Sequence, residues 1–353
     1  EIKTSSGCLI FDPEIGNIRG LQFTYGRRKL DPLNSAPWVD DQASYNDLCP
    51  VERNLSGDFF CAPFGKSDIE EFPTHGWSAN SRWSELSHHA DQIRLGLDAM
   101  IMGAKLTKVL RLSAEAPMLY QENFIEGGTG GLTVAFHPMV HVQSHAVASF
   151  SPKKVALTQK NALDHKRNKL ACSALSSDLR TFPAADGSNV DLTQLPIADN
   201  HEDFVTLIES DESKLGWTAI VRETEDDIVF VLKNPSTLPI TMLWHSNGGR
   251  DNPPWNGRHT RVIGIEDGCA AGSDGHSAAL KENAISAFGV PTCLTLSEGK
   301  THRIAQVIGS VSRPSGWREI ENITVEQSEL IITNTDGRQL KIPYERNFLE
   351  THD

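Results

Sequence analysis

Residues 132–143 of the chain read Leu-Thr-Val-Ala-Phe-His-Pro-Met-Val-His-Val-Gln. Apolar side chains at every second position are typical of a strand with one packed face; here they are Val134, Phe136, Val140 and Val142, with Pro138 in the same row. His137 stands in the other row beside the small Ala135, so we expect its imidazole to point away from the packed face. Pro138 cannot donate a ladder hydrogen bond, which predicts a sheet edge or a bulge at this position.

A lone histidine on a strand is commonly a hydrogen-bonded part of the scaffold, so a functional role for His137 needs further support. His141 and His145 share its parity, which raises the alternative of a metal site. Strand residues four apart lie roughly 13 Å from one another, however, too far for two of them to hold one ion by themselves. We therefore predict no metal here.

The composition bounds the fold and the partners. A chain of 353 residues can form one large all-β domain or two ordinary ones, and 39% hydrophobic residues with 27 Gly and 18 Pro suit a globular protein rich in turns. A formal net charge of -13 disfavours nucleic acid and anionic membrane as partners. No apolar run approaches the roughly 18 residues of a membrane span, and no phosphate-binding glycine loop is present. A small, neutral ligand is expected.

The six cysteines are scattered without a Cys-x-x-Cys spacing; they are Cys8, Cys49, Cys61, Cys172, Cys269 and Cys293. They predict neither a zinc ribbon nor a disulfide framework, which fits a reducing compartment, and we expect a cytoplasmic protein. The chain begins at Glu1 without Met, which leaves room for a removed leader.

Strand-length segments separated by turn signals recur along most of the chain, as at residues 93–102, 105–113 and 118–126. We predict an all-β fold, a single antiparallel two-sheet domain spanning residues 1–353. Residues 313–353 are expected to form a C-terminal strand extension packed on it, with one pair of strands at 323–327 and 329–333.

Two less regular regions interrupt this pattern, and a hairpin is expected near its end. Residues 36–58 are polar and irregular. Residues 150–200 are poorly periodic, and a short helix is expected at 164–175. Residues 291–296 and 301–312 resemble the two strands of a hairpin around Ser-Glu-Gly.

Two aromatic-rich segments carry polar residues that a scaffold alone would not need. His75-Gly76-Trp77 is followed by Arg82-Trp83, and residues 242–257 form a strand that opens into a loop with two Trp, one Arg and three Asn. Indoles beside hydrogen-bond donors are one way in which proteins hold sugars. The alternatives are core tryptophans in the first segment and a glycine- and proline-rich turn in the second.

Glu266 is a candidate general base. In the segment Arg261-Val-Ile-Gly-Ile-Glu-Asp, Ile263 and Ile265 form an apolar row, whereas Gly264 and Glu266 take the opposite face. Gly264 leaves space where a ligand would approach the carboxylate. The alternative is an exposed glutamate on a sheet face.

The order of these pieces resembles a known superfamily. The chain runs His-Gly…Trp, Leu-Thr-Lys-Val-Leu-Arg-Leu, Leu-Tyr, Phe-His-Pro, Leu-Trp and Gly-Ile-Glu. This order resembles the galactose mutarotase-like superfamily, which includes the aldose 1-epimerases and the hexose-6-phosphate mutarotases. The resemblance covers roughly residues 5 to 312.

The resemblance implies an antiparallel β-supersandwich with a sugar site on the concave face of one sheet. It implies that His137 is the general acid, that Glu266 is the general base and that His75 binds sugar oxygens. Further substrate-binding candidates, matched more loosely, are Arg82, Trp77, His201, Asp203 and Trp244. It also implies a cofactor-independent isomerase acting on a small-molecule sugar, either a free aldose or a sugar phosphate, as a monomer or homodimer.

Two departures from the aldose 1-epimerase pattern keep a second function open. Pro138-Met139-Val140 stands where Tyr-Phe and an Asn are common after the acid histidine, and Asp267-Gly268 follows the glutamate where Pro or Thr and then Gln are usual. The alternative is a non-catalytic sugar-binding or sugar-sensing protein on the same fold. An accessory domain of a polysaccharide lyase or glycosidase is a third possibility.

Overall fold

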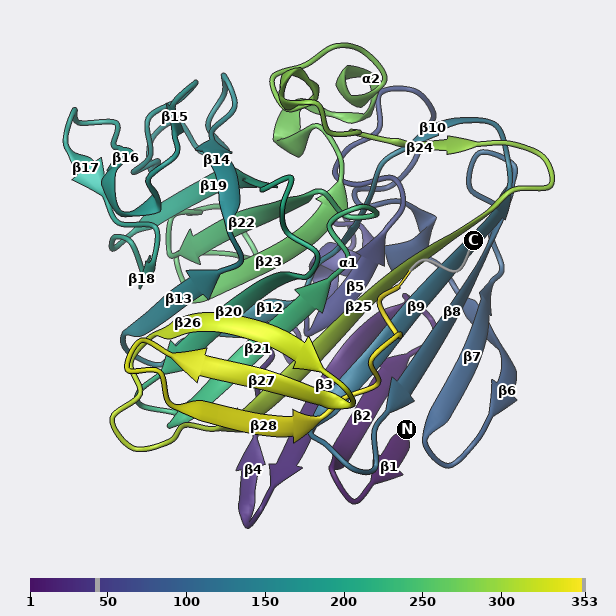
Figure 1. Cartoon of the computed structure of the whole chain (residues 1–353). Helices are drawn as coiled ribbons and strands as arrows, with labels where there is room; N and C mark the ends of the chain where they lie inside the picture. Colours follow the sequence, from purple (N-terminus) through teal and green to yellow (C-terminus); the bar gives the residue numbers. More distant parts are fainter. Residues whose placement is uncertain (42–44, 351–353) are drawn as a thin grey trace.

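The computed structural model describes residues 1–41 and 45–350, and this part of the chain is folded mainly into antiparallel strands. Within it, two large sheets of twelve and nine strands lie face to face (Figure 1). The predicted antiparallel all-β architecture is confirmed.

The larger sheet places strands from both halves of the chain side by side. In spatial order its main path runs β1 (Ile2–Thr4), β2 (Gly7–Asp12), β3 (Asn17–Tyr25), β5 (Asp58–Cys61), β11 (Val134–Phe136), β23 (Val262–Cys269), β22 (Ile240–Asn247), β19 (His201–Glu209), β14 (Lys153–Leu157) and β15 (Leu175–Ser176). Off this path, β4 (Arg28–Leu30) pairs with β3, and β12 (Met139–His141) pairs with β23.

The smaller sheet is built mainly from the middle of the chain. Its spatial order is β18 (Gln194–Leu195), β13 (Ala146–Phe150), β20 (Gly216–Arg222), β21 (Asp227–Lys233), β25 (Thr301–Ser312), β9 (Met118–Gly127), β8 (Ala104–Leu112), β7 (Gln92–Leu97) and β6 (Trp83–His88).

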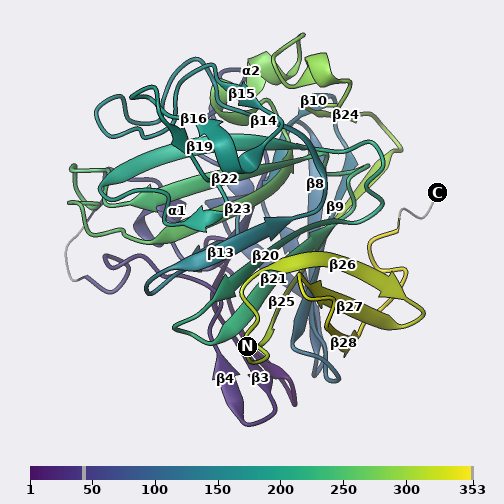
Figure 2. The ribbon, with the colours of Figure 1, turned by 60° about the vertical axis from the view of Figure 1, so that its left-hand side comes forward.

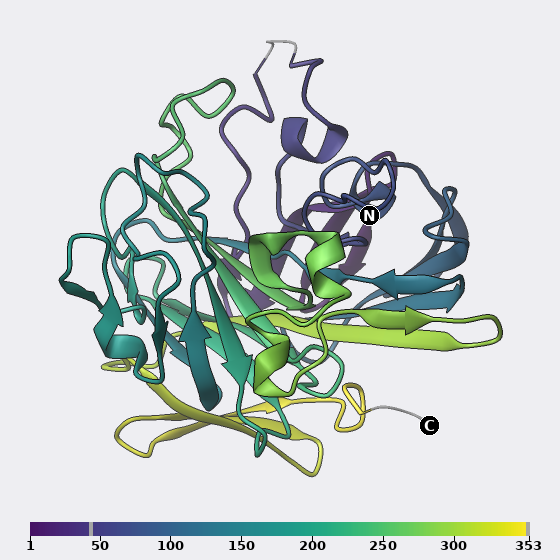
Figure 3. The same ribbon diagram turned by 90° about the horizontal axis from the view of Figure 1, so that it is seen from above.

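Short strands and helical turns lie along the rim of the sandwich, which Figure 3 shows from above. Two small pairs join β10 (Gly130–Leu132) to β24 (Leu294–Leu296) and β16 (Phe182–Pro183) to β17 (Asn189–Val190). The helical turns are α1 (Pro50–Arg53), α2 (His276–Ala279), η1 (Trp77–Ala79), η2 (Leu179–Thr181), η3 (Gly272–Asp274) and η4 (Ser286–Phe288). In the described ranges, no helix has the length and apolar character needed to cross a membrane.

Apolar side chains from both large sheets fill the space between them. Val134, Phe136, Val140 and Val142 are all buried there, so the predicted packed row is confirmed. Ile263 and Ile265 of β23 belong to the same core. Fully burying a side chain of this size stabilises the fold by about 1.5–3 kcal/mol relative to its exposed state.

The strand predicted at 132–143 is interrupted at His137 and Pro138. Segments β11 and β12 both pair with β23, with Ala135 opposite Gly268 and Met139 opposite Gly264. The register is the same on both sides of the interruption, so His137 falls directly opposite Glu266. Pro138 accepts a bond from the Ile265 N–H (2.9 Å) but cannot return one. The interruption therefore lies inside the sheet and does not shift the register, so it is neither the sheet edge nor the bulge that Pro138 predicted.

Two further predictions were wrong. Residues 164–175 form turns, a single bridge and the start of strand β15 instead of a helix. Strands β24 and β25 do not form a hairpin with each other, because β24 pairs with β10 while β25 lies between β9 and β21. Tertiary pairing overrides the local turn signal there. The irregular region predicted at 36–58 contains α1, and its residues 42–44 lie outside the described ones.

The C-terminal segment covers the outer face of the smaller sheet (Figure 2). Its described part, residues 313–350, contains β26 (Ile320–Glu326), β27 (Glu329–Asn334) and β28 (Gln339–Pro343), one strand more than the predicted pair. Ile323, Leu330 and Ile332 pack there against Trp217 and Phe230 of the smaller sheet.

Truncating one of these anchors tests how much this cover stabilises the fold. Ile332 is fully buried, so Ile332→Ala should lower the free energy of unfolding by about 2–5 kcal/mol through lost burial and a residual cavity. Thr333→Ala, on the other face of the same strand, is the matched control. Chemical denaturation checks both, and an equal, small loss in the two variants would contradict the assigned packing.

Candidate active site

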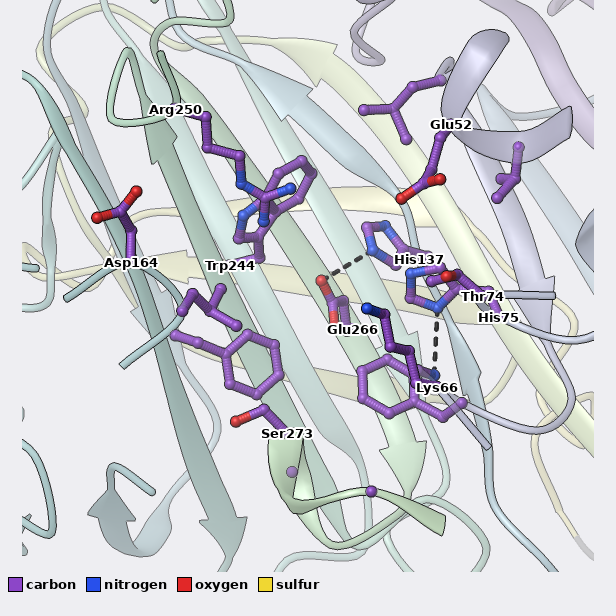
Figure 4. A pocket seen from close by; sticks show the side chains of 18 of the residues that line it. Glu52, Lys66, Thr74, His75, His137, Asp164, Trp244, Arg250, Glu266 and Ser273 are labelled. Atoms are coloured by element: carbon purple, nitrogen blue, oxygen red, sulfur yellow. Dashed lines mark hydrogen bonds and ion pairs between the residues drawn. The ribbon is translucent and has the colours of Figure 1, made fainter. Parts of the chain in front are cut away.

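A pocket of about 510 Å³ opens on the face of the twelve-stranded sheet that points away from the smaller sheet. His75, His137, Trp244 and Glu266 line it together, and Figure 4 shows their side chains converging. They come from four separate segments: the loop before η1, the interruption between β11 and β12, and strands β22 and β23. The size lies within the range typical of small-molecule sites.

His137 and Glu266 form a direct pair in the floor of the pocket. His137 Nε2 lies 2.9 Å from Glu266 Oε1, and the two side chains are only 5% and 2% exposed. Directly opposed residues on antiparallel strands approach most closely where they do not exchange ladder hydrogen bonds. The adjacent bond from Ile265 to Pro138 places the His137–Glu266 pair at such a position.

The environment of His137 favours its protonated form. Burial alone would lower the pKa of His137, but the charge of Glu266 and its hydrogen bond outweigh this effect and raise the pKa above its usual value. The ring also stacks on Phe59, with centroids 4.4 Å apart. The pair can therefore hold a proton on the imidazole beside a carboxylate that accepts one.

His75 is held in the opposite protonation state. Its burial, and then the charges of His137 and Arg250, lower the pKa of His75 well below the usual value. The Gly65 N–H can only donate, and it points at His75 Nδ1 (3.4 Å), so the ring proton is on Nε2. Cys61 Sγ lies 3.2 Å from the same Nδ1. A neutral imidazole with Nε2–H is thus available as a hydrogen-bond donor.

The backbone conformation explains why a glycine follows His75. His75 and Gly76 both have positive φ, +65° and +74°. A Cβ on residue 76 would lie 1.9 Å from the Ala62 carbonyl oxygen, so only glycine fits there. The left-handed conformation of His75 is a strained one that the surrounding loop maintains.

A buried carboxylate organises the aromatic wall. Glu202 of β19 is fully buried and accepts hydrogen bonds from Trp244 Nε1 (2.6 Å) and Ser246 Oγ (3.0 Å). It also pairs with Arg250 Nε at 2.9 Å. The guanidinium lies over the Trp255 ring, 4.3 Å from its centroid. Burial raises the pKa of Glu202, whereas Arg250 and the two hydrogen bonds oppose that shift.

Gly264 gives this wall its shape. A Cβ at residue 264 would meet Glu266 Oε1 at 3.1 Å and the Trp244 side chain at 3.2 Å. The space beside Gly264, which we expected a ligand to occupy, is therefore partly filled by the Trp244 side chain.

Four predicted binding residues lie outside this pocket. Arg82 is exposed and 3.9 Å from Glu14, and Trp77 is 36% exposed in η1. His201 and Asp203 are buried on the opposite face of β19, where His201 Nδ1 lies 2.7 Å from Asp203 Oδ2. Asp203 also accepts the backbone N–H groups of Lys169 and Leu170. The structure does not bring these four residues to the pocket, so their role in sugar binding stays a prediction.

The pocket contains residues that the sequence did not single out as binding candidates: Glu52, Lys66, Asp164 and Phe204. Arg250 and Trp255 also line it, from the aromatic-rich segment 242–257 that the sequence indicated only as a whole. The alternation of β19 contained a usable signal: Val205 and Leu207 fill the inter-sheet core, so Glu202 and Phe204 must take the other face. Arg250 and Trp255 lie on an irregular loop, where no period places a side chain. In the described ranges, no group of three His, Cys, Asp or Glu residues could hold a metal ion.

The raised pKa of His137 predicts a specific pH dependence. An unfolded histidine titrates near pH 6.5, so the stabilisation from this pair is fully present below that pH. It is lost as the pH rises through the higher pKa of the folded state. The difference in unfolding free energy between wild type and Glu266→Gln should therefore shrink as the pH rises above about 6.5. A difference that grows with pH in denaturation experiments would contradict the pairing.

No protein-family model and no curated protein matches the sequence, but solved structures match the fold. A candidate aldose 1-epimerase from Escherichia coli K12 is 13% identical, with a TM-score of 0.59, and the match covers 88% of this chain and 98% of that one. A galactose mutarotase related enzyme from Lactobacillus acidophilus is 10% identical, with a TM-score of 0.56 over 89% and 97%. A galactose mutarotase-like protein from Lactobacillus casei is 12% identical, with a TM-score of 0.53 over 88% and 98%. The chain thus has the galactose mutarotase-like fold.

Proposed function

We propose that this protein is an aldose 1-epimerase, which interconverts the two anomers of a sugar by opening and closing its ring. The observation that carries the proposal is the pair formed by His137 Nε2 and Glu266 Oε1, 2.9 Å apart in the floor of the pocket. The anomeric hydroxyl and the ring oxygen of a pyranose are bonded to the same carbon. An acid and a base that serve them must therefore be close neighbours, as these two groups are.

The proposed reaction is a pair of proton transfers. Glu266 takes the proton of the anomeric hydroxyl while His137 gives its Nε2 proton to the ring oxygen. The bond between the anomeric carbon and the ring oxygen breaks, and an open-chain aldehyde forms. After rotation about the bond from C1 to C2, the reverse transfers close the ring on the other face and restore both residues.

The surrounding groups support a neutral aldose as substrate. His75 Nε2–H can donate to a sugar oxygen, and the Trp244 and Trp255 rings offer apolar faces for C–H groups. Lys66 and Arg250 are the cations that line the pocket in the described ranges, but Arg250 is already paired with Glu202. Glu52 and Asp164 at the same pocket add negative charge, which disfavours a sugar phosphate.

A second function, sugar binding without catalysis, is favoured by one observation. His137 and Glu266 bond directly to each other and are almost completely covered. Glu266 Oε2 is buried without a hydrogen-bond partner in the described residues. Ring opening requires that the sugar first separates His137 from Glu266. A protein in which this pair stays hydrogen-bonded would bind the sugar without converting it.

Removing either member of the pair distinguishes the two functions. Glu266→Gln keeps the size of the side chain but removes the proton acceptor, and His137→Asn removes the acid. Each should lower the rate of anomer exchange by at least about 100-fold, the lower end for a positioned acid–base group. The double variant should be little worse than either, because the two groups act as a unit.

Anomer exchange of freshly dissolved aldoses, followed by NMR, measures these rates. Glu329→Gln, an exposed carboxylate of β27, is the matched control and should exchange at the wild-type rate. Sugar affinity should change much less than the rate in all variants. Wild-type exchange no faster than buffer, together with clear sugar binding, would assign the protein to the second function.

Substituting each of two arginines of one loop distinguishes a loss of sugar contacts from a general disturbance of the loop. Arg250 lines the pocket, whereas Arg258 pairs with Asp41 away from it. Arg250→Met should weaken sugar binding roughly tenfold, about the loss of one hydrogen bond to a charged group. Arg258→Met should leave affinity unchanged. Titration calorimetry with the aldose that exchanges fastest measures both, and equal losses would contradict a contact between Arg250 and the sugar.

A further inference from the structure

A buried carboxylate lies behind His137, in the interior between the two large sheets. Asp58 of β5 is only 1% exposed, and both of its oxygens are occupied. Oδ1 accepts the backbone N–H of His137 at 2.9 Å, and Oδ2 accepts Gln121 Nε2 from β9 of the opposite sheet at 2.7 Å. Burial raises the pKa of Asp58, whereas the bonds from Gln121 and the His137 N–H and the charge of Lys108 oppose that shift. The geometry, with a donor at each oxygen, is the pattern of an ionised carboxylate.

The end of the pairing between β11 and β5 makes this contact possible. At the non-hydrogen-bonded position opposite Glu266, the N–H of His137 points away from β23 and toward β5. The β5 pairing stops at Phe136 opposite Phe60, so the side chain of Asp58 receives this N–H in place of a ladder carbonyl. Without that acceptor, a buried N–H would be left unpaired at the residue that faces Glu266.

Asp58 is also one of the few charged groups near the imidazole of His137. The titratable or hydrogen-bonding groups that face His137 or Asp58 come from each neighbouring element. They are Glu266 on β23, His75 before η1, Cys61 on β5, Lys108 on β8 and Gln121 on β9. Lys108 Nζ donates to the Gly16 carbonyl at 3.3 Å and lies 4.8 Å from the Trp83 ring centroid. Burial lowers the pKa of Lys108 to about 8.

We propose that Asp58 is a positioning residue of the acid–base pair, which fixes the backbone of His137 opposite Glu266 and adds a second buried negative charge that favours the protonated imidazole. This inference rests on the proposed function for its kinetic consequence. Its structural part, the effect of Asp58 on the titration of His137, holds for a sugar-binding protein as well.

Asp58→Asn tests the charge while keeping the shape. The amide oxygen can still accept the His137 N–H, so the backbone stays in place and the negative charge is lost. NMR titration of the His137 ring should show its pKa below the wild-type value. His137 acts as the acid, so the alkaline limb of the rate profile should move to lower pH. Exchange at pH 8 should fall roughly tenfold, less than expected for loss of the acid itself.

Asp227→Asn is the matched control for a purely structural effect. Asp227 is equally buried and pairs with Arg222, and it belongs to the other sheet. It should lower stability without moving the titration of His137. Gln121→Met provides a second test should Asp58→Asn fail to fold, because it removes one donor to Asp58 but leaves the His137 contact. It should shift the titration in the same direction by less.

The outcomes separate this inference from the proposed function. An unchanged titration of His137 in folded Asp58→Asn, or in Gln121→Met when the former does not fold, would overturn the role of Asp58. Wild-type anomer exchange and its loss in Glu266→Gln would stand in that case. Absence of exchange in wild type, with a shifted titration in Asp58→Asn, would overturn the enzyme and keep the positioning residue.

Discussion

The register between β23 and the interrupted strand β11–β12 is the constraint on which the site depends. Ala135 and Met139 pair with Gly268 and Gly264 on either side of the interruption, and only this register sets His137 opposite Glu266. A slip by one residue would turn one of the two side chains into the inter-sheet core. The packed row that includes Val134 and Val140 fixes the register, because the same slip would expose those side chains.

Buried charges join the two sheets directly behind this register. Lys233 of the smaller sheet is fully buried, with its Nζ 3.0 Å from both Glu209 and Asp267 of the larger one. Gln306 adds a bond of 2.9 Å to Asp267, the neighbour of Glu266. Removing one partner of such a buried pair typically costs about 3–5 kcal/mol. Asp267, one of the two residues after Glu266 that depart from the aldose 1-epimerase pattern, thus anchors β23 in the interior.

Strand alternation predicted much of the fold and the centre of the site, because it reports which face of a sheet each side chain takes. It identified the packed row around Phe136 and placed His137 and Glu266 on the other face. In β19 the same alternation turns His201 and Asp203 to the interior face, although the resemblance implied that they bind the sugar. The residues on irregular segments, Arg250 above all, follow no period, and their positions depend on contacts distant in sequence.

The strand pairing also could not be read from local patterns. Chain segments around residues 60, 135 and 265 become neighbours only when the whole sheet forms, and turn signals carry no information about such partners. The prediction of a hairpin at residues 291–312 was wrong for this reason. The resemblance predicted the fold correctly, because it rests on the order of motifs along the whole chain.

In the proposed reaction, a sugar enters between His137 and Glu266 with its anomeric carbon facing both. A crystal structure of the protein with a bound aldose would reveal this arrangement. We expect the ring oxygen within about 2.6–3.2 Å of His137 Nε2 and the anomeric hydroxyl at the same range from Glu266. The direct bond between the two side chains should then be broken. A sugar bound against Trp255 and Arg250 with that bond intact would contradict this binding mode.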